Sequence, residues 1–145
     1  MPRSPLKGKS LMTRELDDKV LVSGQIRPDE IAALRAEGVT LIINNRPDGE
    51  EPNQPLGVEI EKAATAAGMD YRSVPIIRGI GPADADAMRD AIAASSGKVL
   101  AFCRSGTRSA LAWALAKNDE GMAREEIERR LISAGVDPTP IAHLF

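Results

Sequence analysis

The sequence predicts an α/β fold: a single domain with a central, mainly parallel sheet of about four or five strands and helices on both faces. Two observations carry this prediction. Short apolar segments alternate with amphipathic segments that end at glycine, which is the rhythm of strand–helix units. The apolar segments are nearly continuous, as is typical of parallel strands buried on both faces. The chain has 145 residues, enough for one domain, and shows neither an internal repeat nor a domain linker.

The N-terminal half shows clear signals for the ends of its elements. Pro28 stands at the first position of a helix and Gly38 just past its end, which is the usual asymmetry of helix termini. The β-branched run VTLIINN that follows predicts a buried strand. In order, this half is expected to hold a strand at 20–24, a helix at 27–38, a strand at 39–45, a polar loop at 46–55 and a helix at 56–68.

The C-terminal half continues the same alternation and then departs from it. The run KVLAF predicts a strand, and the segment after CRSGTRS has helical character. Ile127, Leu131 and Ile132 follow at helical spacing, so two successive helices are expected there. In order, this half is expected to hold a strand at 69–77, a helix at 83–95, a strand at 98–102 and helices at 110–118 and 123–135.

Composition excludes several classes of function. A net charge of -2 argues against a nucleic-acid or membrane surface, and no apolar run is long enough to span a bilayer. One cysteine and one histidine, His143, are too few for a Cys/His metal site, so neither a metal nor a cofactor is expected. Nothing requires an oxidising compartment, which favours a cytoplasmic location. Residues 1–12 are expected to be a flexible tail, with Met12 as an alternative first residue, ahead of a domain at 13–145.

The segment CRSGTRS is the candidate reactive loop. It follows the strand at 98–102, and ligands of open parallel sheets bind at the carboxyl ends of strands. Gly106 permits a tight turn, and the backbone N–H groups of the loop and of the next helix can together cradle an anion. Arg108 can grip two anion oxygens, and the helix end and both arginines favour the reactive thiolate of Cys103. The anion-binding loop is therefore expected to consist of Arg104, Ser105, Gly106, Thr107, Arg108 and Ser109.

This loop resembles the loops of two enzyme families. Cysteine-dependent phosphatases place five residues between cysteine and arginine, whereas rhodanese-type sulfurtransferases often place four, as between Cys103 and Arg108. The two helices after the loop resemble a small dual-specificity phosphatase, so a cysteine-phosphatase-like fold is expected, with a rhodanese-like fold as the alternative. The combination SGQ, EIAALRAEGVTLIINNRPDGEEPNQP, GMDYRSVPI and CRSGTRSALAWAL is similar to the bacterial beta-lactamase-hydrolase-like phosphatase-like family, or DUF442, over roughly residues 13–140.

Phosphate and sulfur chemistry differ in whether they need a general acid. A phosphatase of this kind usually has histidine before the cysteine, where this chain has Phe102, and it uses an acid because an alkoxide leaves poorly. Sulfite leaves thiosulfate without a proton, so sulfur transfer needs only a thiolate and a cradle. Candidates for an acid or for support of the loop are Asp48, Glu51, Asp84, Asp86 and Arg46. Asp84 and Asp86 are more simply explained as acidic residues in the first turn of a helix, and Asp48 and Glu51 could belong to a solvated turn.

The favoured hypothesis is a sulfurtransferase in which Cys103 takes sulfur from thiosulfate or a low-molecular-weight persulfide and passes it to a thiol or cyanide. The resemblance also implies a partner, a metallo-β-lactamase-fold persulfide dioxygenase. One alternative is a phosphatase that uses Cys103 and Arg108 with Asp84 or Asp86 as the acid. The other is a non-catalytic module that senses an anion or an oxidant through the thiol.

Overall fold

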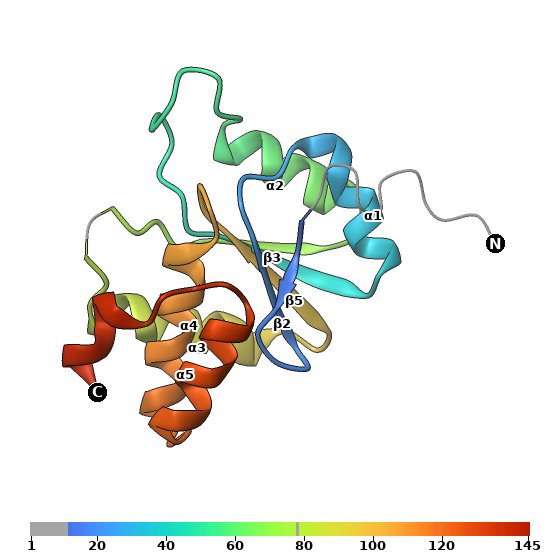
Figure 1. The fold of residues 1–145 in the computed structure, drawn as a ribbon. Helices are drawn as coiled ribbons and strands as arrows, with labels where there is room; N and C mark the ends of the chain where they lie inside the picture. The colour runs from blue at the N-terminus through green and yellow to red at the C-terminus, as the bar shows by residue number, and fades with distance from the viewer. Residues whose placement is uncertain (1–11, 78) are drawn as a thin grey trace.

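The computed structural model describes residues 12–77 and 79–145, and it has a five-stranded sheet in the order β1-β2-β5-β3-β4 (Figure 1). Strands β2, β5, β3 and β4 are parallel, and β1 pairs antiparallel with β2 at one edge. The strands are β1 (Arg14–Glu15), β2 (Val20–Ser23), β3 (Val39–Asn44), β4 (Asp70–Ser73) and β5 (Lys98–Phe102). The predicted mainly parallel sheet is confirmed.

Helices cover both faces of the sheet, as predicted (Figure 1). Side chains of the central strands alternate between the two faces, so Ile43 and Ala101 join one apolar cluster while Ile42 and Leu100 join the other. The first cluster includes α3 (Pro82–Ala94), α4 (Thr107–Asp119) and α5 (Arg124–Ser133), and the second includes α1 (Ile31–Ala36) and α2 (Gly57–Ala66). The sheet is therefore the middle of three layers.

The register of the strands brings several loops to one edge of the sheet. Phe102, at the end of β5, pairs with Asn44 of β3 and with Ser23 of β2, and Asn44 also pairs with Ser73 of β4. Because these four strands run in the same direction and end in register, the segments that follow them emerge together. The loop that begins with Cys103 thus lies beside the segments after β2, β3 and β4.

Several elements differ from the sequence-based expectation in extent. Strand β5 spans the predicted residues, but only 70–73 of the expected strand at 69–77 is regular. Beyond Ser73 the chain still donates hydrogen bonds from Val74 and Ile76 to the carbonyls of Asn44 and Asn45, but it has no regular strand structure. The helix expected at 27–38 begins as a 3-10 turn, η1 (Pro28–Glu30), before α1. Strand β1 and the C-terminal 3-10 helix η2 (Thr139–Leu144) were not predicted. The expected tail at 1–12 falls almost wholly outside the described residues.

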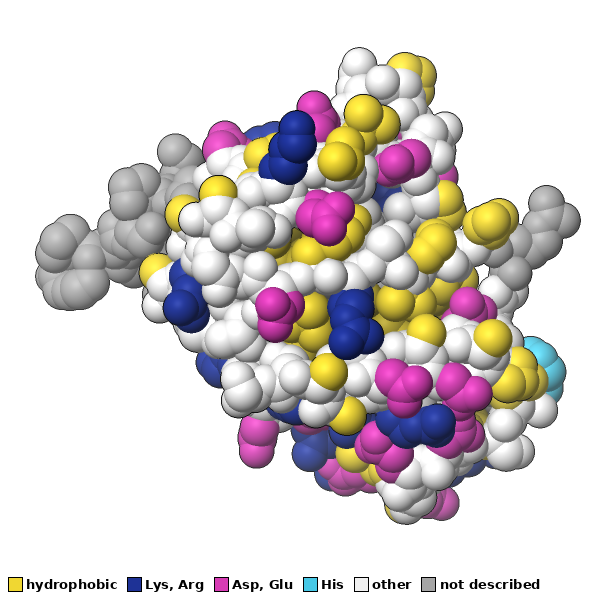
Figure 2. Space-filling view, turned by 180° about the vertical axis from the view of Figure 1, so that it is seen from behind, with side chains coloured by type: hydrophobic (Ala, Val, Ile, Leu, Met, Phe, Trp, Pro, Cys, Tyr) yellow, Lys and Arg dark blue, Asp and Glu magenta, His cyan; other side chains and the backbone are white. Residues whose placement is uncertain are grey.

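The face of the molecule seen in Figure 2 mixes acidic and basic side chains without a broad area of one sign.

Among residues 12–77 and 79–145, no helix has the length and apolar character needed to cross a membrane. The same part of the chain contains no cluster of histidine, cysteine and carboxylate side chains able to hold a metal ion.

Candidate active site

Cys103 follows β5 directly and lies in a tight loop that leads into α4. The side chain is almost fully buried, and the backbone N–H of Gly106 donates a hydrogen bond to its Sγ at 3.0 Å. Gly106 has a φ of 95°, a left-handed conformation that glycine adopts without strain. This turn brings the N–H of Gly106 back over the sulfur and starts α4 at Thr107, so that the positive end of the helix dipole lies beside the thiol.

The carbonyl groups of the loop are held away from the sulfur by β1 and by the segment after β2. The carbonyl oxygen of Arg104 accepts a hydrogen bond from the N–H of Gln25 at 3.3 Å, and that of Ser105 accepts one from Arg14 Nη2 at 2.7 Å. A Cβ atom on Gly24 would stand only 2.9 Å from the Arg104 oxygen, so the close approach requires glycine there. With its carbonyls turned outward, the loop directs N–H groups inward, which favours an anion.

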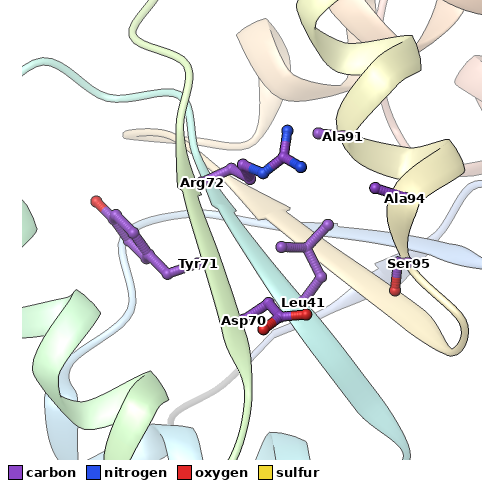
Figure 3. Close-up of a pocket in the computed structure, with 7 residues that line it drawn as sticks. All are labelled: Leu41, Asp70, Tyr71, Arg72, Ala91, Ala94 and Ser95. Atoms are coloured by element: carbon purple, nitrogen blue, oxygen red, sulfur yellow. The ribbon is translucent and has the colours of Figure 1, made fainter.

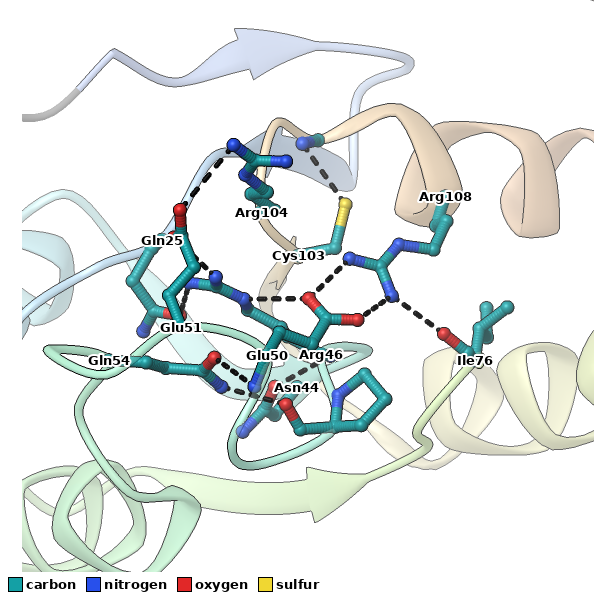
Figure 4. A network of polar contacts seen from close by, with 12 residues as sticks. Gln25, Asn44, Arg46, Glu50, Glu51, Gln54, Ile76, Cys103, Arg104 and Arg108 are labelled. Carbon is teal, nitrogen blue, oxygen red and sulfur yellow. Dashed lines mark hydrogen bonds and ion pairs between the residues drawn. The ribbon is translucent and has the colours of Figure 1, made fainter. Parts of the chain in front are cut away.

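The guanidinium of Arg108 is fixed on two of its three edges. Nη1 donates to Glu50 Oε2 and to the carbonyl oxygen of Ile76, both at 2.7 Å, while Nη2 donates to Glu50 Oε1 at 2.9 Å. The remaining edge, which carries Nε–H and the second hydrogen of Nη2, points toward Cys103 (Figure 4). The bond to Glu50 raises the pKa of Arg108 above its ordinary value, burial opposes this shift and the Cys103 thiolate adds to it.

Two glutamates connect the loop at 46–55 to the arginines around Cys103 (Figure 4). Glu50 also accepts from Arg46 Nε at 2.9 Å, and Glu51 accepts from Arg46 Nη2 at 2.7 Å and lies 3.4 Å from Arg104. Arg46 is buried, and its Nη1 donates to Gln25 at 3.0 Å. The bond to Arg108, followed by that to Arg46, lowers the pKa of Glu50 from 4.5 to about 2, against the effect of burial. The bond to Arg46 lowers the pKa of Glu51 as well.

The predicted candidate carboxylates have different places in the structure. The sequence indicated Asp48 or Glu51 as the partner of Arg108 or Arg104. Glu51 does pair with Arg104, at 3.4 Å, whereas Arg108 pairs with Glu50. Asp48 instead accepts from the N–H of Gly57 at the start of α2 at 2.8 Å. Asp84 accepts from the N–H of Gly81 at 2.9 Å and so caps α3. Asp86 lies 3.1 Å from Arg89 on the same helix. Asp48, Asp84 and Asp86 therefore each have a structural partner away from the thiol.

The small polar residues of the loop form local contacts. Ser105 Oγ and Thr107 Oγ1 are 3.1 Å apart, and Ser105 Oγ also accepts from the N–H of Thr107 at 3.4 Å. Ser109 is fully buried on α4, and no described residue hydrogen-bonds its Oγ. Phe102, which stands where many phosphatases have histidine, is buried in the cluster under α1 and α2.

A groove of about 400 Å³ opens beside Arg108, between the start of α4 and the C-terminal η2. Thr107 and Arg108 contribute its polar wall, and the exposed His143 lies at its other side. Nothing in the sequence predicts that η2, which carries His143, lies beside the reactive loop. The groove is otherwise lined by Gly79, Ile80, Leu111, Pro140, Ile141 and Leu144.

A second hollow lies at the opposite end of the strands, where Leu41 pairs with Asp70 (Figure 3). Its walls are formed by β3, β4 and the end of α3, and the lining residues are Leu41, Asp70, Tyr71, Arg72, Ala91, Ala94 and Ser95. The side chain of Tyr71 itself points to the opposite face of the sheet (Figure 3). It shares no residue with the Cys103 loop, so the reactive loop remains the centre of the candidate site.

The fold and the loop together define a cysteine-phosphatase-like domain: a strand, a buried cysteine, a cradle of N–H groups and an arginine at the start of a helix. The sequence profile of the beta-lactamase hydrolase-like protein, phosphatase-like domain, matches residues 12–119. The chain belongs to this family, as its sequence predicted.

Named relatives agree with this assignment. The beta-lactamase hydrolase-like protein of Xylella fastidiosa is 42% identical over an alignment of 116 residues that covers 79% of this chain. That of Agrobacterium fabrum is 37% identical over an alignment of 118 residues that covers 78% of this chain. This chain spans only 27% of the length of either relative.

Solved structures show the same fold. A Neisseria meningitidis protein described as a "putative phosphatase" is 33% identical, with a TM-score of 0.80 over 90% of this chain and 94% of that one. The active form of Tk-PTP is 20% identical, with a TM-score of 0.64 over 91% of this chain and 92% of that one, and shows a likeness of fold alone.

Proposed function

We propose that this chain is a cysteine-dependent phosphatase. The observation that carries the proposal is that Cys103 Sγ, which accepts a hydrogen bond from the N–H of Gly106 at 3.0 Å, faces the edge of Arg108 that Glu50 and Ile76 leave exposed to it (Figure 4). A phosphoryl group bound there would receive N–H donors from the loop and a planar pair of donors from the arginine. The likeness to phosphatase structures supports this function better than sulfur transfer, which the sequence analysis favoured.

The reaction would proceed in two displacements at phosphorus. The Cys103 thiolate attacks the phosphorus, the bond to the ester oxygen breaks, and that oxygen leaves with the electron pair. Water then attacks the cysteinyl-phosphate, which releases inorganic phosphate and returns the thiolate. Arg108 and the N–H groups of the loop stabilise the charge on the equatorial oxygens in both steps.

The carboxylates near the site indicate which esters suit it. With a pKa of about 2, Glu50 is ionised near neutral pH and cannot donate a proton to a leaving group. Glu51 is held by Arg46, and Asp48 by the N–H of Gly57. We therefore expect activity on aryl and acyl phosphates, whose leaving groups depart without protonation, and little on alkyl phosphates.

The test compares aryl phosphate hydrolysis by the wild-type protein, Cys103→Ser and Arg108→Lys. We expect turnover by the wild type, none by Cys103→Ser, and a rate that falls steeply as the leaving group becomes more basic. Brief acid quenching should trap a protein with the mass of one added phosphoryl group, which Cys103→Ser lacks. Wild-type protein that hydrolyses neither aryl nor acyl phosphates would refute the proposal.

Sulfur transfer is the second candidate. It needs no proton donor, so the engagement of Glu50, Glu51 and Asp48 with other partners is compatible with it. The four-residue spacing between Cys103 and Arg108 also favours it. The Cys103 thiolate would attack the outer sulfur of thiosulfate, and the bond between the two sulfur atoms would break as sulfite leaves with its electron pair. Cyanide or a thiolate would then attack the outer sulfur of the Cys103 persulfide and release the Cys103 thiolate.

Intact mass after incubation with thiosulfate distinguishes this candidate. A gain of one sulfur atom, absent in Cys103→Ser and removed by cyanide, would support it, whereas an unchanged mass would count against it. A persulfide dioxygenase partner is proposed only together with sulfur transfer. The test is whether the persulfide-loaded protein passes its sulfur to a low-molecular-weight thiol and so forms a persulfide that such a dioxygenase oxidises. A protein active in neither assay would point to the sensing module.

A further inference from the structure

One peptide unit of the reactive loop is held at both of its ends. The N–H of Gly106 donates to Cys103 Sγ at 3.0 Å. The carbonyl of Ser105, which belongs to the same peptide plane, accepts from Arg14 Nη2 at 2.7 Å. Since the carbonyl and the N–H of a trans peptide point in opposite directions, the bond to Arg14 aims the N–H at the sulfur.

Arg14 is itself fixed from three sides. It lies on β1, where it pairs with Val22 of β2. Its Nη1 donates to the carbonyl oxygen of Ala134 at the end of α5 at 3.0 Å. Its guanidinium also lies against Gly106, so closely that a side chain there would collide with Nη2. The short strand β1 thus places a cation behind the loop, on the side away from the anion site.

We propose that Arg14 is a positioning residue that acts on the Cys103 thiolate through the Ser105–Gly106 peptide. A cation at the carbonyl oxygen polarises the peptide and strengthens the hydrogen bond that its N–H donates. It also opposes rotation of the peptide, which would turn the Ser105 oxygen toward the sulfur and repel both a thiolate and a bound anion. The inference goes beyond the proposed function, because it concerns the thiolate whichever group Cys103 transfers.

Other charges also surround the loop and must stay unchanged in a test. They are Arg104 and Arg108 of the loop and α4, and Arg46, Glu50 and Glu51 of the segment after β3. None of these side chains has a hydrogen bond or ion pair with Arg14 among the described contacts. Replacing Arg14 therefore leaves this network in place.

The experiment measures thiolate formation directly by ultraviolet absorbance over a pH series, in Arg14→Met, Arg14→Lys and the wild type. Cys103 is the only cysteine, so the thiolate signal has a single source. We expect the midpoint in Arg14→Met to move to higher pH by about one unit, a roughly ten-fold loss of thiolate below that midpoint, since a hydrogen bond to a charged group is weakened. Arg14→Lys should recover most of the shift.

Arg130→Met is the matched control, because Arg130 also links α5 to the N-terminal segment, through a bond from Nη1 to the carbonyl of Leu16 at 3.0 Å. Its titration midpoint should equal that of the wild type. An unchanged midpoint in folded Arg14→Met, or an equal shift in Arg130→Met, would overturn the proposal. If Arg14→Met fails to fold, Arg14→Lys and Arg14→Gln are compared instead, and equal midpoints in these two would overturn it.

Discussion

Glu50 should make the stability of this protein depend on pH in the acid range. Its carboxylate accepts two hydrogen bonds from Arg108 and one from Arg46, and its side chain is 26% exposed. The pKa of Glu50 falls from 4.5 to about 2 on folding, chiefly through the bond to Arg108. A carboxyl whose pKa is lower in the folded state contributes stability above its unfolded pKa and loses that contribution as the pH falls.

The shift sets the size and the window of the effect. A drop from 4.5 to about 2 corresponds to at most about 3–4 kcal/mol between the two protonation states, and solvent screening of the partly exposed pair reduces this to about 1–2 kcal/mol. The contribution is complete above about pH 5 and lost progressively toward about pH 2. Glu50→Gln should therefore be less stable than the wild type at neutral pH by that amount, and the two should converge in acid.

Urea unfolding at a series of pH values from neutral to strongly acid measures this difference. Glu128→Gln is the control, because the one ion pair that Glu128 forms with the described residues is with Arg124 on the surface of α5, where such a pair contributes about 0.5 kcal/mol or less. Parallel stability curves for the wild type and Glu50→Gln would refute the reasoning. So would a loss in Glu128→Gln as large as that in Glu50→Gln.

Three further predictions follow from single residues of the loop and its supports. Gly106→Ala should lower the free energy of unfolding by more than Gly121→Ala, by about 1 kcal/mol or more in urea unfolding, since both have positive φ but only Gly106 is enclosed by neighbours. Asp48→Ala should cost about 1 kcal/mol of stability by removing the acceptor for the N–H of Gly57, yet leave phosphatase turnover within about two-fold of the wild type. Arg108→Lys should reduce kcat/KM on aryl phosphates by about 100-fold or more, because an ammonium cannot bind two anion oxygens in one plane. Equal stability of the two glycine variants, a large kinetic defect in Asp48→Ala, or near-normal turnover by Arg108→Lys would contradict the respective prediction.

The sheet could be predicted because the apolar runs in the sequence correspond to the strands that the fold buries. β3 and β5 are short apolar runs, and burial on both faces is what such runs imply in a parallel sheet. β1 was missed because a strand of two residues has no periodicity to detect. η2 was missed for a related reason: proline-containing segments near a terminus usually indicate loops, and its position depends on the buried Ile141.

The site was predictable where its chemistry is local and not where it depends on long-range contacts. Cys103, Gly106 and Arg108 lie in one short segment between the end of β5 and the first turn of α4, so their proximity follows from the sequence alone. The choice among Asp48, Glu50 and Glu51 depends on how the 46–55 loop folds over the sheet, because adjacent residues point in different directions there. No pattern could single out Arg14, which is distant in sequence from Ser105 and becomes its neighbour only through the pairing of β1 with β2.

The arrangement of charges explains how a buried cysteine can coexist with so many arginines near it. Glu50 and Glu51 neutralise part of the positive charge of Arg46, Arg104 and Arg108. Only Glu50 of these two binds Arg108, and it does so on the edge of the guanidinium that faces away from the sulfur. The edge of Arg108 toward Cys103 keeps its donors for an incoming anion (Figure 4). A carboxylate that holds an arginine in this way orients it without competing for the same edge, and this is why we expect Glu50 to support anion binding rather than to block it.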